Sequence, residues 1–542
     1  MRRRDLLRST LGAGLGTGLG VGLGAALGGP LFAPSIARAE AARTLRFVPQ
    51  ADAAILDPMI TTGLVNRNHG FLIWDTLYGV DDAFQVQPQM VAGHVVENDG
   101  KTWIMTLREG LAFHDNEPVR ARDVVASLKR WASRDAFGNS LFALVDELAA
   151  PDDRTVRWRL KAPFPLLPLA LGKVGAIVAF IMPERLALTD STMPVKELIG
   201  SGPFRFQADQ HVPGSRLVYS RFANYVPRPD GTPSQLAGPK VAHFDRVEWQ
   251  VIPDPATAAA ALQRGEIDWW DQPIADLLPT LKANEALNVE LLDPIGNVAV
   301  LRFNHTLPPF NNPAIRRAVL SAVDQKDFMA AVAGDDQSLW RDKVGFFAPA
   351  SVMASEEGMA ALNGPRDLDA ARKAIKDAGY NGEKVLLMAP GDFPVIGQMS
   401  EVAADLLRKL GFNLEYAMLD WGSMLRRMAN REPPDRGGYS AFCTYSAGVT
   451  QLNPSAHNFL RGSGDKATFG WSTSPKLEEL RDAWFSASDA EAQKRIGVEM
   501  QRQAFLDVPY VPLGVFYQPT AYNKSLTGML KGLPLFWNVR RG

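Results

Sequence analysis

The sequence feature that most constrains the fold is a run from Trp103 to Trp131 that contains a strand, a turn and a helix in order. Residues 103–107 alternate apolar and polar side chains, as a half-buried strand does. Asp115 and Asn116 supply turn-forming residues ahead of Pro118. The next segment predicts a helix with an apolar stripe of Val124, Val125, Leu128 and Trp131 and a far face of Arg122, Lys129 and Arg130. The run therefore predicts part of an α/β core.

Length, charge and cysteine content narrow the class of protein. A chain of 542 residues is too long for one ordinary core, so we expect two or three packed units. The formal net charge of −1 gives no electrostatic sign of nucleic-acid binding. Cys443 is the only cysteine, which excludes an intrachain disulfide and a thiolate zinc cluster, and we interpret it as a small buried hydrophobe.

The N-terminus has the composition of an export signal. Basic residues from Arg2 to Arg8 precede a Gly/Leu/Ala segment, and Ala37-Arg38-Ala39 places small residues at −3 and −1 of a cleavage point. Arg3-Arg4 resembles the pair of a twin-arginine signal. We therefore predict a signal peptide over 1–39, cleaved near Ala39, and a mature periplasmic protein. A membrane anchor is the alternative, but the glycine content makes the segment weakly hydrophobic.

Local patterns predict further elements in the first half of the chain. Residues 44–48, 155–160 and 247–252 predict strands, and Gly70 to Tyr78 predicts a buried helix. Asp254 and Pro255 supply the N-cap and first residue of an alanine-rich helix that ends at Gly265. Strands are also expected at 200–206 and 265–270, where Gly200 and Gly202 allow another segment to pass close to the backbone.

The second half predicts a large further unit. Residues 301–310 predict a strand followed by a loop, and Asn312 and Pro313 begin a helix. Residues 385–389, 398–410 and 413–419 predict a strand, a helix and a parallel strand. Val511 to Phe516 is expected to return the chain to the first unit.

Several of these segments together resemble one protein family. The run Leu107-Arg-Glu-Gly-Leu-Ala-Phe-His-Asp-Asn-Glu-Pro-Val-Arg-Ala-Arg-Asp-Val124 is similar to the Leu-Arg-x-Gly-x-x-Phe-His-Asp-Gly-x-Pro-x-x-Ala-x-Asp-Val signature of the solute-binding proteins, family 5, of peptide, nickel and opine ABC importers. Asn116 replaces the usual glycine and also tolerates a left-handed backbone. Residues 200–204, 265–268 and 303–324 resemble further elements of the family in the same order.

The resemblance implies a fold and a division into domains. The fold is α/β, of the type II periplasmic-binding-protein kind, with two lobes, a discontinuous first domain and an extra small domain. The first domain would comprise residues 40–79, 199–298 and 510–542, the second 80–198, and the third 299–509. A hinge between the lobes is expected near 298–304 and 504–511.

Motifs for catalysis or metal binding are missing from the mature sequence. It contains no Gly-x-Ser-x-Gly, no His-Glu-x-x-His, no phosphate-binding loop and no dinucleotide fingerprint. The seven histidines are scattered without metal-ligand spacing. We therefore expect a binding protein, not an enzyme, with no catalytic residue, no cofactor and no metal site.

The resemblance implies three ligand-binding loops. They contribute the following residues to the predicted site: Thr61 and Thr62 from the first, Trp421 from the second, and Thr444, Tyr445 and Ser446 from the third. Peptide-binding members of the family commonly have an aspartate in the third loop for the ligand's α-amine, but residues 439–453 contain no acid. Asp52 or Asp420 is an alternative acceptor for such an amine.

The predicted function is that of the substrate-binding component of an ABC importer, which closes two lobes over a peptide or peptide-like solute. Its partners would be the ligand, the permease subunits in the membrane and, for the precursor, the twin-arginine export machinery; it would act as a monomer without nucleic acid. An opine, a sugar-like or amine-bearing metabolite, or a metal chelate are alternative ligands. An exported hydrolase and a chaperone for unfolded peptides are alternatives outside the family.

Overall fold

The computed structural model describes residues 43–487 and 489–542, so the predicted signal peptide over 1–39 lies outside the described residues. Residues 43–542 form one compact unit. Its buried apolar side chains divide into two large cores and one small cluster. The two large cores correspond to two lobes.

The first lobe contains a mixed seven-stranded sheet. Its strand order is β12 (Leu287–Glu290), β19 (Thr520–Asn523), β11 (Trp269–Trp270), β1 (Thr44–Val48), β10 (Arg246–Gln250), β9 (Arg216–Arg221) and β8 (Phe204–Phe206). Only the pairs β1–β10 and β1–β11 are parallel. The lobe's helices are α2 (Leu64–Ile73), α7 (Pro255–Gln263) and α8 (Leu278–Lys282).

A second sheet shares the core of the first lobe. It is antiparallel, in the order β4 (Val91–Glu97), β5 (Thr102–Leu107), β7 (Thr155–Leu160) and β6 (Val145–Ala149). Its helices are α3 (Ala121–Ala132), α4 (Ala136–Leu144), α5 (Leu167–Gly172) and α6 (Glu184–Ala187), and the hairpin β2 (Tyr78–Val80) and β3 (Val86–Pro88) joins it to the rest of the lobe. The strands predicted at 103–107 and 155–160 and the helix predicted after Pro118 are therefore confirmed.

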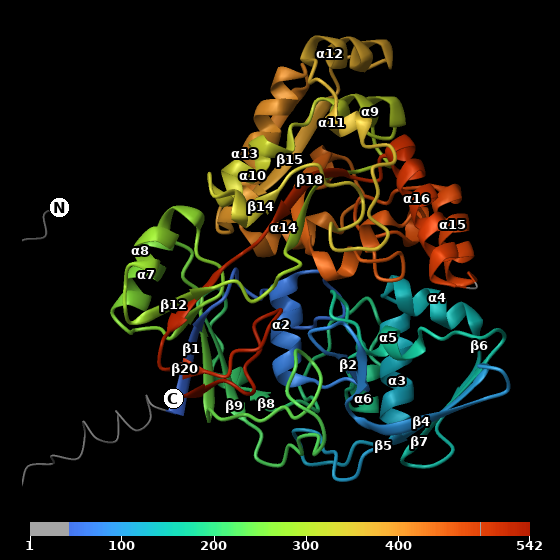
Figure 1. Ribbon diagram of the computed structural model, residues 1–542, viewed down its shortest axis with the longest axis vertical. Helices are drawn as coiled ribbons and strands as arrows, with labels where there is room; N and C mark the ends of the chain where they lie inside the picture. Colours follow the sequence, from blue (N-terminus) through green and yellow to red (C-terminus); the bar gives the residue numbers. More distant parts are fainter. Residues whose placement is uncertain (1–42, 488) are drawn as a thin grey trace, which may run out of the picture. The chain divides into compact units, whose positions relative to one another are not determined.

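The second lobe contains a six-stranded sheet. Its order is β14 (Trp340–Arg341), β18 (Val511–Phe516), β13 (Asn297–Phe303), β17 (Ala441–Ala447), β15 (Lys384–Pro390) and β16 (Asn413–Leu419). Figure 1 shows β14, β15 and β18 in the upper part of the view and β1, β8 and β9 in the lower part. Its helices are α9 (Pro313–Ser321), α10 (Gln325–Ala333), α11 (Ala360–Asn363), α12 (Leu368–Asp377), α13 (Pro394–Lys409), α14 (Trp421–Met428), α15 (Pro475–Phe485) and α16 (Ala490–Asp507). A short ribbon, β20 (Leu526–Thr527) with β21 (Arg540–Arg541), follows near the C-terminus.

The chain crosses between the two lobes twice. The first crossing joins β12 to β13 through residues 291–296, and the second joins β18 to β19 through residues 517–519. Val511–Phe516 pairs with β13 and β14 in the six-stranded sheet, so its expected return to the first unit is wrong, and β19 makes that return instead. The crossings likewise lie outside the ranges expected for the hinge. The domain boundaries themselves stay a prediction.

Other differences concern element ends and one side chain. The helix expected from Gly70 to Tyr78 begins at Leu64 and ends at Ile73, and the strands expected at 200–206 and 265–270 are limited to β8 and β11. The glycines predicted to allow close approach do so, since Gly200 and Gly202 pack against the backbone of Ile73. Arg130 was expected on the exposed face of α3, but it is buried, and its guanidinium lies 2.9 Å from Asp57.

Candidate functional site

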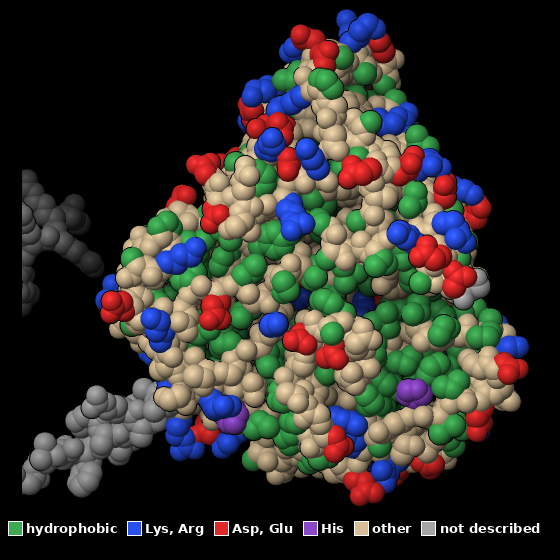
Figure 2. Space-filling view, in the orientation of Figure 1, with side chains coloured by type: hydrophobic (Ala, Val, Ile, Leu, Met, Phe, Trp, Pro, Cys, Tyr) green, Lys and Arg blue, Asp and Glu red, His purple; other side chains and the backbone are tan. Residues whose placement is uncertain are grey.

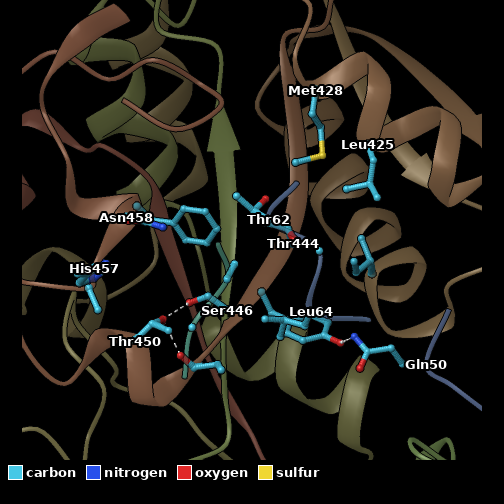
Figure 3. Close-up of a pocket in the computed structure, with 18 of the residues that line it drawn as sticks. Gln50, Thr62, Leu64, Leu425, Met428, Thr444, Ser446, Thr450, His457 and Asn458 are labelled. Atoms are coloured by element: carbon cyan, nitrogen blue, oxygen red, sulfur yellow. Dashed lines mark hydrogen bonds between the residues drawn. The ribbon is translucent and has the colours of Figure 1, made fainter. Parts of the chain in front are cut away.

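A pocket with an empty volume of about 760 Å³ lies where segments of the two lobes meet. We call it the apolar pocket. Its walls come from the loop after β1, the N-terminus of α2, the segment after α5, the N-terminus of α13, α14, β17 and the residues after β17. In Figure 3, Leu425 and Met428 lie on one side and His457 and Asn458 on the other. Figure 2 shows apolar side chains gathered around a hollow in the middle of the visible face.

Five of the six residues predicted for the site line this pocket: Thr62, Trp421, Thr444, Tyr445 and Ser446. Thr61 does not. It is buried, and its hydroxyl accepts a hydrogen bond from the amide of Gly63 at 3.2 Å, which shapes the turn before α2. Whether the five residues touch a ligand stays a prediction.

Trp421 is the first residue of α14 and is 4% exposed. Its backbone amide donates to a carboxylate oxygen of Asp392 at 2.7 Å, and its ring packs edge-on against Phe393. The indole N–H has no hydrogen-bond partner among the described residues. A buried donor on the wall of a pocket is suited to a carbonyl or carboxylate oxygen of a ligand.

Tyr445 joins the two lobes through its hydroxyl. Gln50 donates to this hydroxyl at 3.0 Å, and the hydroxyl donates to Gln272 at 3.3 Å. Gln272 in turn donates to Gln50 at 3.3 Å, which closes a ring of three side chains. Burial raises the pKa of Tyr445, so the hydroxyl stays protonated. The ring of hydrogen bonds connects the ends of β1 and β11 to β17.

Sequence reasoning missed the apolar wall. Phe393, Ile396, Leu425 and Met428 line the pocket together with Leu64 and Phe459. Trp421, Leu425 and Met428 stand at i, i+4 and i+7 of α14, which places them on one face. That spacing is visible in the sequence, but it equally indicates an ordinary core-facing helix.

The lining of the apolar pocket contains one charged side chain, Lys173, and no acid. Lys173 forms a buried ion pair with Asp135, so its charge is already compensated. Asp52 and Asp420, the alternative acceptors for an amine, do not line the pocket. Asp420 instead caps α14 by accepting from the amide of Ser423 at 2.8 Å.

A second pocket, also of about 760 Å³ empty volume, adjoins the first and shares Gln50, Leu64 and Ala447 with it. We call it the polar chamber. Its charged lining residues are Arg67 on α2, Asp271 after β11 and Asp293 in the first crossing. Burial raises the pKa of Asp271 to about 7, although Arg67 opposes this, and burial lowers the pKa of Arg67 to about 10. No residue of this chamber was predicted from the sequence.

Two further properties bear on the class of protein. No group of three or more His, Cys, Asp or Glu side chains among residues 43–487 and 489–542 is arranged to hold a metal ion. Within the same ranges, no helix has both the length and the hydropathy needed to cross a bilayer.

The chain is similar to a known family and to a curated relative. The family described as bacterial extracellular solute-binding proteins, family 5 Middle, matches residues 85–470. A protein of Sinorhizobium fredii named "Probable peptide ABC transporter periplasmic-binding protein y4tO" is 37% identical over 546 residues, which covers 99% of both chains.

Solved structures share the fold at lower identity. The periplasmic binding protein AgaA of A. tumefaciens R10, in complex with agropinic acid, superposes with a TM-score of 0.77 at 21% identity, covering 92% of this chain and 99% of that one. DppA of Helicobacter pylori, in complex with the peptide STSA, superposes with a TM-score of 0.75 at 21% identity, covering 92% and 98%. These likenesses confirm the predicted type II periplasmic-binding-protein fold.

Proposed function

The chain belongs to the bacterial extracellular solute-binding proteins of family 5, and from this premise we propose that it captures a peptide or peptide-like solute between its lobes for delivery to an ABC permease. It is thus a binding protein and not an enzyme. The apolar pocket carries the proposal, because it lies between two separately packed cores and takes walls from both lobes. Sites between domains, mostly apolar with a few placed polar groups, are typical of small-molecule binding.

Closure of the lobes would occur about the two crossings, residues 291–296 and 517–519. Both are short, so they can rotate without disturbing either sheet. Contacts that would form on closure are visible away from the crossings. Arg461 donates to the carbonyl of Ala136 at 3.0 Å, and the rings of Phe137 and Phe485 stack 6.0 Å apart. A ligand that contacts both lobes stabilises the closed form by its differential affinity for it.

The relatives favour a peptide over the other candidate ligands. The 37% identical protein of S. fredii has a peptide transporter name, whereas the opine-bound AgaA is only 21% identical and supports the fold alone. The absence of a metal-ligand cluster from the described residues gives no support to direct metal coordination, although an intact chelate would need none.

A calorimetric titration of the mature chain tests the ligand class. Apolar peptides of two to five residues are titrated in parallel with agropinic acid and with nickel–histidine complexes. We expect saturable binding of at least one peptide and none of the other two. If agropinic acid is the only compound that binds, the ligand is an opine and the proposed peptide ligand is wrong.

The proposed function also includes an export route and an oligomeric state. We infer that the twin-arginine pair Arg3-Arg4 directs export, that cleavage occurs near Ala39, and that the mature protein acts as a periplasmic monomer. Mass spectrometry of the periplasmic protein after replacement of both arginines by lysine tests the export route, since precursor should then accumulate in the cytoplasm. Light scattering of the purified protein gives its mass in solution.

A further inference from the structure

The polar chamber beside the apolar pocket contains buried acceptor atoms without donors. Asp271 is 8% exposed and Gln235 is 4% exposed, and both line the chamber. Oδ2 of Asp271 and Oε1 of Gln235 have no hydrogen-bond partner among the described residues. A buried acceptor without a hydrogen bond destabilises a folded protein. A ligand with donors for both atoms would form the missing hydrogen bonds.

Asp271 is better placed for this task than the other acid of the chamber. One oxygen of Asp293 already accepts from the amides of Ile295 and Gly296, at 2.9 and 3.3 Å, so this carboxylate shapes the turn before β13. The carboxylate of Asp271 has a backbone hydrogen bond from Gln50 and keeps Oδ2 free. The amide of Asp271 is held by the carbonyl of Val48 at 2.9 Å, which fixes its backbone at the end of β11.

The charges of the chamber also favour a cation. The guanidinium of Arg67 donates to Asn68 at 2.7 and 3.1 Å and to the carbonyl of Val174 at 3.2 Å, all neutral acceptors. It nevertheless interacts electrostatically with both Asp271 and Asp293. With both carboxyl groups ionised, these three residues have a net charge of −1, and a ligand with one positive group would balance it. Burial raises the pKa of Asp271 to about 7, so a positive group beside this carboxyl would favour its ionised form.

We propose that the polar chamber receives a cationic hydrogen-bond donor of the ligand, an ammonium or guanidinium group, with Asp271 and Gln235 as its acceptors and the rest of the ligand in the apolar pocket. This inference rests on the proposed function and specifies the ligand. The two compartments adjoin at their shared lining residues Gln50, Leu64 and Ala447. The positive group is assigned to the chamber because two acids line the chamber and none lines the apolar pocket.

The test compares matched peptides with and without a positive group. Leucine-based peptides of two to five residues are titrated as free amines, as N-acetylated forms, and as N-acetylated forms with a lysine side chain. We expect a form with a positive group to bind about tenfold or more tightly than its neutral counterpart. The two charged forms distinguish an α-ammonium from a side-chain cation.

The variant Asp271→Asn identifies the acceptor. It should reduce the preference for the charged form over the acetylated form to less than about threefold. Asp276→Asn, an exposed aspartate five residues further along that lines neither compartment, is the matched control and should keep the preference. Circular dichroism of both variants verifies that they fold.

The outcomes separate this inference from the proposed function. Equal binding of charged and neutral peptides, or a preference that survives in Asp271→Asn, would overturn the cation site and leave peptide capture standing. If no peptide binds in any form, the proposed function fails and the inference fails with it.

Discussion

At the scale of single residues, two polar atoms of the adjoining compartments stand out. The indole N–H of Trp421 and one carboxylate oxygen of Asp271 are buried in adjoining compartments and have no hydrogen-bond partner within residues 43–487 and 489–542. Trp421 was predicted because residues 419–422 resemble a ligand-binding loop of the family. Asp271 was not predicted, since a lone acid after two tryptophans has no recognisable spacing.

Trp421→Ala should weaken binding of the best peptide about tenfold to a hundredfold, because it removes both a large apolar contact and the free donor. Titration calorimetry measures the change. Trp421→Phe is the informative companion, since it keeps an aromatic ring and removes only the N–H; an intermediate affinity is expected. An unchanged affinity in Trp421→Ala would remove this residue from the site.

The ionisation of Asp271 should make the ligand-free protein less stable as pH rises. Its folded pKa of about 7 lies above the ordinary value of 3.8, so its favourable contribution is complete below about pH 4 and is lost as pH rises through 7. Arg67 reduces the loss, and the neighbouring Tyr445 is neutral throughout. Asp271→Asn lacks this dependence. The melting temperature of the wild type minus that of the variant should therefore fall between pH 4 and 7, and a constant difference would contradict the assignment.

At the scale of elements, the sequence predicts what local chemistry determines. β7, β15 and β16 lie within one residue of their predicted ranges, and the caps Asp254 and Asn312 accept from the amides of Thr257 and Ala314. The prediction is wrong where contacts between distant segments determine the position of an element. Val511–Phe516 is apolar throughout and suits any buried strand, so only its partners β13 and β14 show which sheet it joins.

Helix α3 provides a test of one such error. Arg130 and Lys129 are adjacent, but Arg130 is buried against Asp57 and donates to the carbonyls of Asp190 and Met193 at 2.9 and 2.7 Å, whereas Lys129 is exposed. Arg130→Met should cost about 3–5 kcal/mol of unfolding free energy, because it leaves Asp57 without its charge partner. Lys129→Met should change it by less than about 0.5 kcal/mol. Urea unfolding distinguishes the two, and similar values would contradict the burial of the pair.

The segment before β8 provides a test of a prediction that the structure confirms, the close approach of another segment to Gly200. A Cβ at Gly200 would lie 2.0 Å from the carbonyl oxygen of Ile73, which is backbone and cannot give way easily. Gly200→Ala should therefore lower stability by about 1–3 kcal/mol or more. Gly93→Ala on β4 has no atom within 4 Å of the added carbon and should be neutral or slightly stabilising. Thermal unfolding of the two variants compares them directly.

At the scale of the whole molecule, the sequence predicts the class well and the ligand poorly. Short motifs from Leu107 to Asp324 occur in the same order as the family's elements. The family match over residues 85–470 confirms the resemblance that these motifs indicate. The ligand depends on which side chains from distant segments meet between the lobes. Gln50, Gln272 and Tyr445 form one hydrogen-bonded ring, although they are separated by 173 to 395 residues in the sequence. No local sequence pattern predicts such a contact.

The most direct test of lobe closure is small-angle X-ray scattering of the mature chain, with and without a saturating peptide identified by calorimetry. We expect a smaller radius of gyration with the peptide bound, and the peptide recovered intact afterwards. A radius of gyration that stays constant at full saturation, or a peptide that is chemically altered, would contradict capture by closure about residues 291–296 and 517–519.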